Sequence, residues 1–420
     1  MKTIVLEKNI NCHLHQTTKF NDITISFRFR NNLSNIKRSA RAFLTQILSD
    51  TCLDLPTKDA VTRYLDTCYG TNFKASGDVI GKLDVIEFRV STLNGKLVDE
   101  DLLEKQLYLL YQFIYRPRLV DGFFDETLFN EMKERLILVI NSYHDQPGSH
   151  ASDQAKRHFN QSQASKALPT IEEIQNTTNQ DVVDAYNQLI NEDALDIFVL
   201  GDFDESVVSN YLTTIFNFKA KNSYTDVLDL NTRDTTNEII EHKAISQTRM
   251  IIMFTTNQTM LDSSYPAMLL ANGIFGAFPS SYLFQEIREK RSLCYSISSR
   301  LDNYDGLISV STAIDGNNYE TVKSLVLEQL KRIQNGDLSD ELFETTRKMY
   351  LNVLRSSQDS QKSILTLDYR RILLNDTVEI NNVIEAIKHL NKEDCIEAFK
   401  KVEPKLFYCL MQEAQHEENE

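Results

Sequence analysis

The 420-residue sequence has few of the residues that interrupt regular structure, with 12 glycines and 7 prolines. It has no Cys-x-x-Cys pair among its six cysteines, and no apolar run approaches the roughly 18 to 20 residues that a membrane span needs. Residues 1–15 contain no signal-peptide core. These absences argue against long disordered linkers and against a membrane protein. The scattered cysteines indicate reduced, partly buried thiols, so we expect a soluble, cytoplasmic protein.

Positive charge is also in short supply. The chain has 60 acidic and 45 basic residues, and its formal net charge is -15. This sign argues against a partner that is a nucleic acid or an anionic membrane surface, because both attract basic proteins. A basic peptide partner would be favoured by the average charge.

An internal repeat organises the chain, because the same elements appear in the same order in both halves. The first half predicts a strand at 23–30, helices at 37–50 and 58–68 with Thr57 as N-cap, strands at 72–76 and 84–92, and helices at 99–113 and 124–143. The second half predicts a strand at 249–257, a helix with Pro266 in its first turn, a helix at 281–290, strands at 293–300 and 306–313, and helices at 317–334 and 339–357. Each half closes with a helix and a strand, at 181–186 and 197–201 and again at 395–399 and 406–410.

The chain is too long for one ordinary core, so the repeat predicts two domains. The predicted fold class is α+β, with two tandem homologous units, each an antiparallel-dominated sheet with helices packed on one face. We expect domains at 1–217 and 248–420, joined by a polar linker at 218–247. Two such units facing each other would form a clamshell.

The strongest local signal is the run SSYLFQEIREKRSLCYSISSR at 280–300, preceded by NGIFGAFP at 272–279. This run resembles the C-terminal-domain motif of the insulinase/pitrilysin family of inverted-motif zinc peptidases, whose members also duplicate an α+β unit of this size. The resemblance covers nearly the whole chain. It implies that Arg288 and Tyr295 bind the substrate and stabilise the scissile carbonyl oxygen, which suits two hydrogen-bond donors. Ser292 departs from the motif, where the family commonly has glycine.

Active members of this family carry His-x-x-Glu-His on the first helix of the N-terminal domain, where the two histidines bind zinc and the glutamate is the general base. The matching positions here are Ala42, Thr45 and Gln46, and none of these side chains can replace the motif. No histidine occurs anywhere between His15 and His144, so a helical zinc pair is excluded in any alignment register. We therefore expect no cofactor in this chain.

A distal glutamate completes the zinc site in active members. This chain has Val139 where a glutamate is usual, with Glu131 and Glu134 nearby, and a lone carboxylate there would be a helix surface residue.

The remaining histidines offer weaker candidates for a metal site. His13 and His15 are two residues apart and would share one strand face, but no third ligand is indicated. His144, His150 and His158 flank a polar segment that suggests a mobile loop.

The missing metal motif and the retained Arg288 and Tyr295 resemble the non-catalytic subunit of bacterial two-chain peptidases of this family. That resemblance implies a heterodimer with a zinc-bearing paralogue, and an active site completed by Arg288 and Tyr295 for cleavage of short unfolded peptides. The isolated chain could also form homodimers. The alternative is a catalytically dead scaffold or binding protein of the same fold, with no role in peptide turnover. A peptidase that uses His13 and His15 is a third and weaker hypothesis.

Overall fold

The computed structural model describes residues 1–375 and 379–413, which form two compact units. Unit 1 consists of residues 1–141 and 169–227, and unit 2 of residues 142–168 with the described residues from 228 onward. Residues 142–168, which the sequence analysis assigns to the first domain, thus pack within unit 2.

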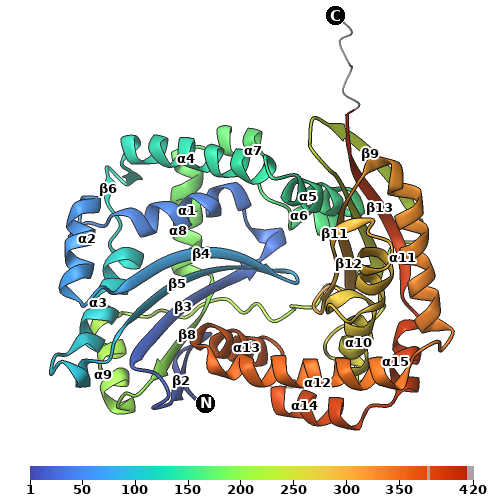
Figure 1. The fold of residues 1–420 in the computed structure, drawn as a ribbon. Helices are drawn as coiled ribbons and strands as arrows, with labels where there is room; N and C mark the ends of the chain where they lie inside the picture. The colour runs from blue at the N-terminus through green and yellow to red at the C-terminus, as the bar shows by residue number, and fades with distance from the viewer. Residues whose placement is uncertain (376–378, 414–420) are drawn as a thin grey trace, which may run out of the picture. The chain divides into compact units, whose positions relative to one another are not determined.

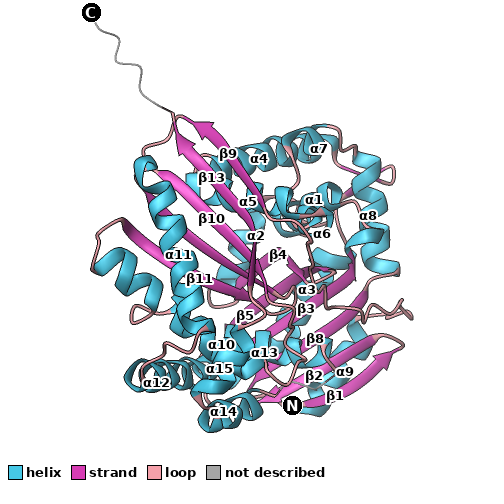
Figure 2. Ribbon diagram, turned by 90° about the vertical axis from the view of Figure 1, so that its right-hand side faces the viewer, coloured by secondary structure: helices cyan, strands magenta, loops and turns pink. Residues whose placement is uncertain are grey.

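Unit 1 is built on a six-stranded sheet with the order β1-β2-β8-β3-β5-β4 (Figure 2). Its strands are β1 (Lys2–Glu7), β2 (Ile10–Gln16), β3 (Asp22–Asn32), β4 (Asn72–Ile80), β5 (Leu83–Leu93) and β8 (Ala194–Gly201). All neighbouring strands are antiparallel except β2 and β8. Residues 23–30 form a strand, as their alternating apolar and polar side chains predict. The polar side chains do not face solvent, however, because both faces of β3 are buried. Its polar face pairs Arg28 with Glu87 and Arg30 with Asp196.

The helices of unit 1 supply the other half of its core. They include α1 (Arg38–Asp50), α2 (Lys58–Thr67), α3 (Leu102–Tyr115), α4 (Glu126–His144), α7 (Ile171–Gln175), α8 (Asn179–Asn191) and α9 (Glu205–Ile215). A short ribbon of β6 (Leu119–Val120) and β7 (Phe123–Phe124) precedes α4. In α1, Phe43, Leu44 and Ile47 recur at helical spacing and point into the core. Thr57 caps α2 by accepting the Ala60 N–H at 3.1 Å, as predicted.

Unit 2 repeats this topology in a five-stranded sheet with the order β11-β12-β10-β13-β9. Its strands are β9 (Asn237–Lys243), β10 (Thr248–Thr255), β11 (Cys294–Asp302), β12 (Leu307–Ile314) and β13 (Glu403–Gln412). The parallel pair β13–β9 corresponds to β8–β2 of unit 1. The predicted α+β repeat is thus confirmed. The stretch expected to be a linker contains β9, the counterpart of β2.

Helices cover both faces of the second sheet (Figure 1). The helices of unit 2 are α5 (Pro147–Phe159), α6 (Gln161–Ser165), α10 (Tyr265–Asn272), α11 (Tyr319–Gln334), α12 (Asp340–Ser356), α13 (Gln361–Leu373), α14 (Ile380–His389) and α15 (Lys392–Phe399). Helices α10, α11 and α15 pack on the face that holds Ile252 and Val310, whereas α5 packs on Ile251 and Met253. Pro266 lies in the first turn of α10, as predicted.

The prediction of a mobile loop around three histidines is wrong. His144 is the last residue of α4, and His150 and His158 lie on α5. The polar composition of this segment is misleading because α5 needs only Ala151, Ala155 and Phe159 to contact its sheet. A helix with a narrow apolar stripe is easily mistaken for a loop.

The structure bears on the predicted state of the cysteines and on the predicted lack of a membrane-spanning helix. All six cysteines are free thiols, and five of them are buried. Among the described helices, none combines the length and the apolar character needed to cross a lipid bilayer.

A buried ionic cluster fixes α1 on the sheet of unit 1. The Arg41 guanidinium, whose side chain is 2% exposed, pairs through Nη1 with Asp193 at 2.7 Å and through Nε with Asp84 of β5. Asn31 of β3 donates to the other oxygen of Asp193 at 2.6 Å. Burial raises the pKa of Asp193, and the charge of Arg41 opposes that rise. The cluster is therefore favourable only when all of its members are present.

We predict that Arg41→Ala lowers the free energy of unfolding by about 3 to 5 kcal/mol, because two carboxylates would be left buried without their cation. Urea denaturation at pH 7 measures this loss. The control is Arg63→Ala, which removes an exposed pair with Asp59 and should cost less than about 1 kcal/mol. Equal effects of the two substitutions would contradict the assigned role of Arg41.

Candidate functional site

Arg288 lies in a π-helical segment, Phe284–Glu289, directly before strand β11. In π-helical geometry a backbone N–H bonds to the carbonyl five residues earlier. Lys290 makes such a bond to the Gln285 carbonyl at 3.0 Å. These turns are rare and occur frequently at functional sites. A helix was predicted here, but its π geometry was not.

The turn between this segment and β11 depends on Ser292, which has a positive φ of 53°. Its N–H donates to the Arg288 carbonyl, and the Leu293 N–H donates to the Ile287 carbonyl, both at 3.0 Å. The left-handed conformation costs a residue with a Cβ about 1 to 2 kcal/mol, whereas glycine adopts it freely. Serine therefore keeps the turn at the one motif position where the family commonly has glycine.

Glu286 anchors the π-helical segment to its surroundings. Its carboxylate accepts hydrogen bonds from Lys290 at 2.6 Å and from Arg291 at 3.2 Å, and it pairs with Arg332 of α11 at 3.5 Å. The hydrogen bond from Lys290 is the main reason that the pKa of Glu286 lies below its usual value. Lys290, Arg291 and Arg332 thus neutralise Glu286 and stabilise the segment. Arg288 takes no part in this group of ion pairs.

Among the residues that the structure describes, the hydrogen-bond and ring partners of the Arg288 side chain are close to it in sequence. It is 40% exposed, and its Nη1 lies 3.1 Å from the carboxylate of its neighbour Glu289, which is itself half exposed. Its guanidinium carbon lies 4.5 Å from the ring centroid of Phe284, one turn earlier. An exposed pair of this kind contributes little energy. The guanidinium is therefore oriented by Phe284 and remains accessible to a ligand.

Tyr295 presents its ring to solvent at the start of β11. It is 80% exposed, which is unusual for a residue with so much apolar surface. The strand register shifts between Cys294 and Ile297, so Tyr295 lies in a bulge. Bulges redirect side chains and are common beside active sites. Within the described part of the chain, the phenol makes no hydrogen bond and no ring contact.

A second π-helical segment, Gly273–Ala277, packs against the buried face of strand β11. The buried Ser299 hydroxyl donates to the Asn272 side-chain oxygen at 2.7 Å. A Cβ at Gly276 would lie 2.7 Å from both Ser299 Oγ and Leu283 Cδ1, so only glycine permits this approach. The strand that carries Tyr295 is thereby seated on the helical layer.

The positions that match the zinc motif lie on α1 in unit 1. Ala42, Thr45 and Gln46 are half-buried, and the Thr45 hydroxyl donates to the Ala42 carbonyl at 2.9 Å. A methyl, a hydroxyl and an amide do not form the nitrogen, sulfur or carboxylate set that zinc requires. Within the described residues, no group of three or more His, Cys, Asp or Glu side chains is arranged to hold a metal ion.

The carboxylates considered as a distal ligand are surface residues of α4. Glu131 and Glu134 are exposed, and Glu131 pairs with Lys58 at 2.6 Å. Val139, at the position where a glutamate is usual, is also exposed. The structure therefore does not bring these residues into a site with Ala42 or Gln46.

His13 has a structural role in the sheet of unit 1. It is buried on β2, where Nε2 lies 3.1 Å from Asp196 and Nδ1 lies 3.0 Å from the Thr3 hydroxyl. Both ring nitrogens are thus engaged, which removes the lone pair that a metal would need. His15 lies on the same strand two residues further along and shares this face, as expected.

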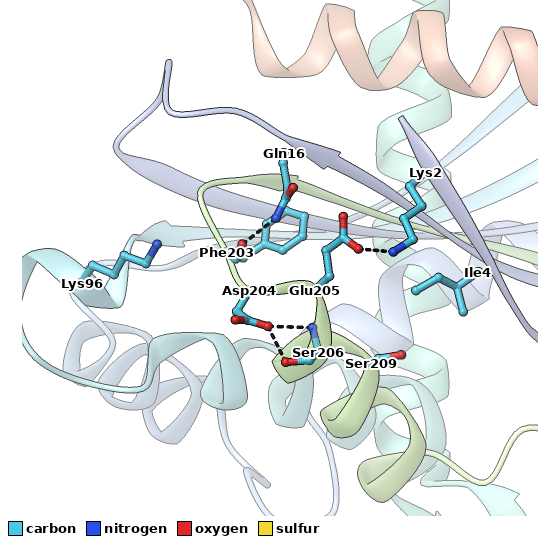
Figure 3. Close-up of a pocket in the computed structure, with 9 residues that line it drawn as sticks. All are labelled: Lys2, Ile4, Gln16, Lys96, Phe203, Asp204, Glu205, Ser206 and Ser209. Carbon is cyan, nitrogen blue, oxygen red and sulfur yellow. Dashed lines mark hydrogen bonds and ion pairs between the residues drawn. The ribbon is translucent and has the colours of Figure 1, made fainter.

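Unit 1 has an open cavity of about 770 Å³ where α9 begins, shown in Figure 3. Its two lysines are neutralised within the unit, Lys2 by Glu205 and Lys96 by Asp202. Asp204 caps α9 by accepting the Ser206 N–H at 2.7 Å. Both lysines of this cavity are thus paired within unit 1.

Known proteins resemble this chain along its whole length. Residues 176–350 match the family model described as peptidase M16 inactive domain. In Bacillus subtilis strain 168, the probable inactive metalloprotease YmfF is 27% identical over 408 residues, covering 96% of this chain and 95% of that protein. The uncharacterized zinc protease YmxG of the same strain is 21% identical over 355 residues, covering 81% of this chain and 85% of that protein. The crystal structure of a conserved protein from Enterococcus faecalis V583 has a TM-score of 0.93 at 24% identity, over 99% of both chains.

These similarities confirm the resemblance to the insulinase/pitrilysin peptidases, which are also called M16 peptidases, and to inactive members among them. They also confirm the predicted fold class over the full length of the chain. The roles expected for Arg288 and Tyr295 remain predictions.

We predict that Ser292→Val lowers the free energy of unfolding by about 1 to 2 kcal/mol, because a β-branched residue is strained at positive φ. Ser292→Gly should change it by less than about 1 kcal/mol, because relief of strain offsets the entropy of glycine. Thermal denaturation of both variants measures the difference. Ser298→Val, on an exposed position of β11, is the control and should be neutral. Equal tolerance of valine at both positions would show that the turn is not strained.

Proposed function

Because this chain is an inactive homologue of the M16 metalloproteases, we propose that it is the zinc-less subunit of a heterodimeric endopeptidase. Its partner would be a paralogue with an intact zinc motif, and the pair would cleave short unfolded peptides. In this arrangement Arg288 and Tyr295 contact the substrate in the active site of the partner. The resemblance of this chain to both an inactive metalloprotease and a zinc protease of one bacterium supports such a pairing.

The accessibility of Tyr295 is the observation that carries this proposal. A tyrosine that is 80% exposed in a strand bulge contributes little to the stability of the fold. Within the described residues, the Arg288 side chain pairs with Glu289 and stacks on Phe284, both close to it in sequence. Both groups are hydrogen-bond donors, and both lie at the junction of a π-helical segment with β11. Such accessible donors suit a peptide carbonyl oxygen on which negative charge develops.

Each residue has a distinct task in the proposed complex. The Arg288 guanidinium binds a carbonyl of the peptide backbone, and its stacking on Phe284 limits its rotation. The Tyr295 hydroxyl donates to the oxygen of the scissile carbonyl, and this bond strengthens as charge accumulates there. The partner supplies zinc and the carboxylate that takes a proton from water. Enclosure between the subunits admits flexible peptides and excludes folded proteins.

A second candidate function is a scaffold or binding protein that takes no part in turnover. Helix α4 favours it by exposing two adjacent apolar side chains, Leu138 at 67% and Val139 at 52%. These side chains suit contact with a partner or a second copy of this chain. The scaffold role does not require Arg288 or Tyr295. We propose a cytoplasmic location for either role, since all six cysteines are free thiols.

We predict that a peptide library is cleaved by this chain mixed with an intact-motif paralogue from the same source, and not by this chain alone. In the mixture, Tyr295→Phe should lower kcat/KM about 10²-fold to 10³-fold, the effect of losing one oxyanion donor. Arg288→Ala should have an effect of similar size. Mass spectrometry of the products measures each rate.

Tyr108→Phe is the matched control, because Tyr108 is an exposed tyrosine of unit 1 and should leave the rate unchanged. A mixture no faster than the paralogue alone would reject the subunit role. A faster mixture that is insensitive to changes at Arg288 and Tyr295 would favour the scaffold role.

Metal removal distinguishes the two chains. We predict that a chelator abolishes cleavage by the mixture, and that metal analysis of the separated proteins finds stoichiometric zinc only in the paralogue. Zinc added to this chain alone should not change its melting temperature, because His13 is already engaged by Asp196 and Thr3. Stoichiometric zinc in the isolated chain, lost on His13→Ala, would instead support the His13 and His15 hypothesis.

A further inference from the structure

Unit 2 contains a cavity of about 460 Å³ on the sheet face that carries α5. Helix α5 covers the β10 and β13 side of this face, and the β11 and β12 side forms the cavity floor. Figure 1 shows α5 and α6 on this face and α11 on the other. The volume lies within the range of ligand-binding cavities.

Hydroxyl groups cover the floor of the cavity. Ser298 of β11 lies opposite Ser311 of β12, and Arg300 lies opposite Ser309. On the next strand, β10, Ile251 lies opposite Ser311 and Met253 lies opposite Ser309. At these two residues α5 begins to cover the sheet. The floor thus offers hydrogen-bond donors and acceptors on an otherwise exposed sheet surface.

Three basic side chains converge on this cavity from different elements. They are Lys156 of α5, Arg249 of β10 and Arg300 of β11. Within the described residues, none of the three forms an ion pair or a hydrogen bond through its side chain, and Arg249 Nε is buried without a partner. The one acidic side chain in the lining, Asp302, accepts the backbone N–H groups of Tyr304 and Asp305 at 3.1 and 3.2 Å.

This charge pattern is unexpected for so acidic a chain. With acidic residues in excess by 15, most basic groups should find a carboxylate, as the two lysines of the unit 1 cavity do. Lys156 and Arg249 are half-buried and Arg300 is exposed, and a half-buried cation without a partner is unfavourable. Two such cations, with the exposed Arg300 in the same lining, indicate that an anion from outside the described chain balances the charge of this cavity.

We infer that this cavity binds the carboxylates of an acidic peptide segment. Guanidinium groups bind carboxylates through paired hydrogen bonds, and the floor serines bond to the peptide backbone. The inference rests on the proposed function and adds a substrate class to it. Tyr295 and Arg300 are five residues apart on β11, which is roughly 17 Å at the rise of an extended chain. A peptide held at Tyr295 would therefore place acidic residues about five positions from the scissile bond.

Direct binding to the complete isolated chain tests this assignment without the partner. A fluorescein-labelled peptide with three adjacent glutamates is compared by anisotropy with the same peptide carrying glutamines. We expect the acidic peptide to bind at least tenfold more tightly in low salt, with the preference reduced at 0.5 M salt. Arg300→Gln should weaken its binding roughly fivefold to tenfold, and Arg249→Gln/Arg300→Gln should abolish the preference.

Controls separate the cavity from the general charge of the protein. Lys96→Gln removes a cation from the unit 1 cavity and should leave binding unchanged, whereas Arg300→Lys should restore only part of the affinity lost in Arg300→Gln, because lysine keeps the charge but cannot form the paired hydrogen bonds. Equal affinity for the two peptides would overturn the inference. Inorganic phosphate that displaces the acidic peptide at micromolar concentration would also overturn it, in favour of a small-anion site. A melting temperature near that of wild type verifies that each variant is folded.

The failure of this inference can be distinguished from failure of the proposed function. If the mixture with the paralogue cleaves peptides but the isolated chain ignores charge, only the acidic-substrate assignment falls. If the chain binds acidic peptides selectively but the mixture cleaves nothing, only the subunit role falls. When both hold, peptides with a glutamate five positions from the cleaved bond should be cleaved faster than their glutamine counterparts, and Arg300→Gln should remove that difference.

Discussion

The site in unit 2 depends on the close seating of β11 on the helical layer. The hydrogen bond from Ser299 to Asn272 and the bare Cα of Gly276 allow the strand to approach the Gly273–Ala277 segment. Because side chains alternate along a strand, this buried contact directs Ser298 and Arg300 to the opposite face. One polar contact in the core thus sets the orientation of the cavity floor, and the bulge at Tyr295 frees that side chain from the alternation.

The two units use charged residues in different ways. In unit 1 several charged side chains form buried ion pairs that stabilise the fold. Arg41 pairs with two aspartates, and Asp196 pairs with Arg30 and His13. In unit 2 Glu286 is also paired, whereas Tyr295 is 80% exposed and Lys156, Arg249 and Arg300 line one cavity. The accessible groups of unit 2 support the proposed subunit role, in which the paralogue would hold the zinc.

Much of the fold and part of the site could be predicted from the sequence. Alternation at 23–30, capping by Thr57 and the repeated element order are local signals, and each corresponds to an observed element. The missing zinc ligands were equally visible, because residue identity alone excludes them. Helix α5 was missed because its apolar stripe is narrow. Strand β9 was missed because an edge strand with one parallel neighbour has a mostly polar sequence, which is also typical of a linker.

The sequence by itself determined the repeat, the order of the elements, the absence of zinc ligands on α1 and the location of the motif around Arg288 and Tyr295. These features follow from local spacing and residue type. Only the tertiary structure decided that residues 142–168 pack on the second sheet, that Tyr295 is exposed while His13 is engaged, and that Lys156, Arg249 and Arg300 surround one cavity. Such features depend on contacts between residues distant in sequence, and average charge carries no information about which basic residue meets a carboxylate.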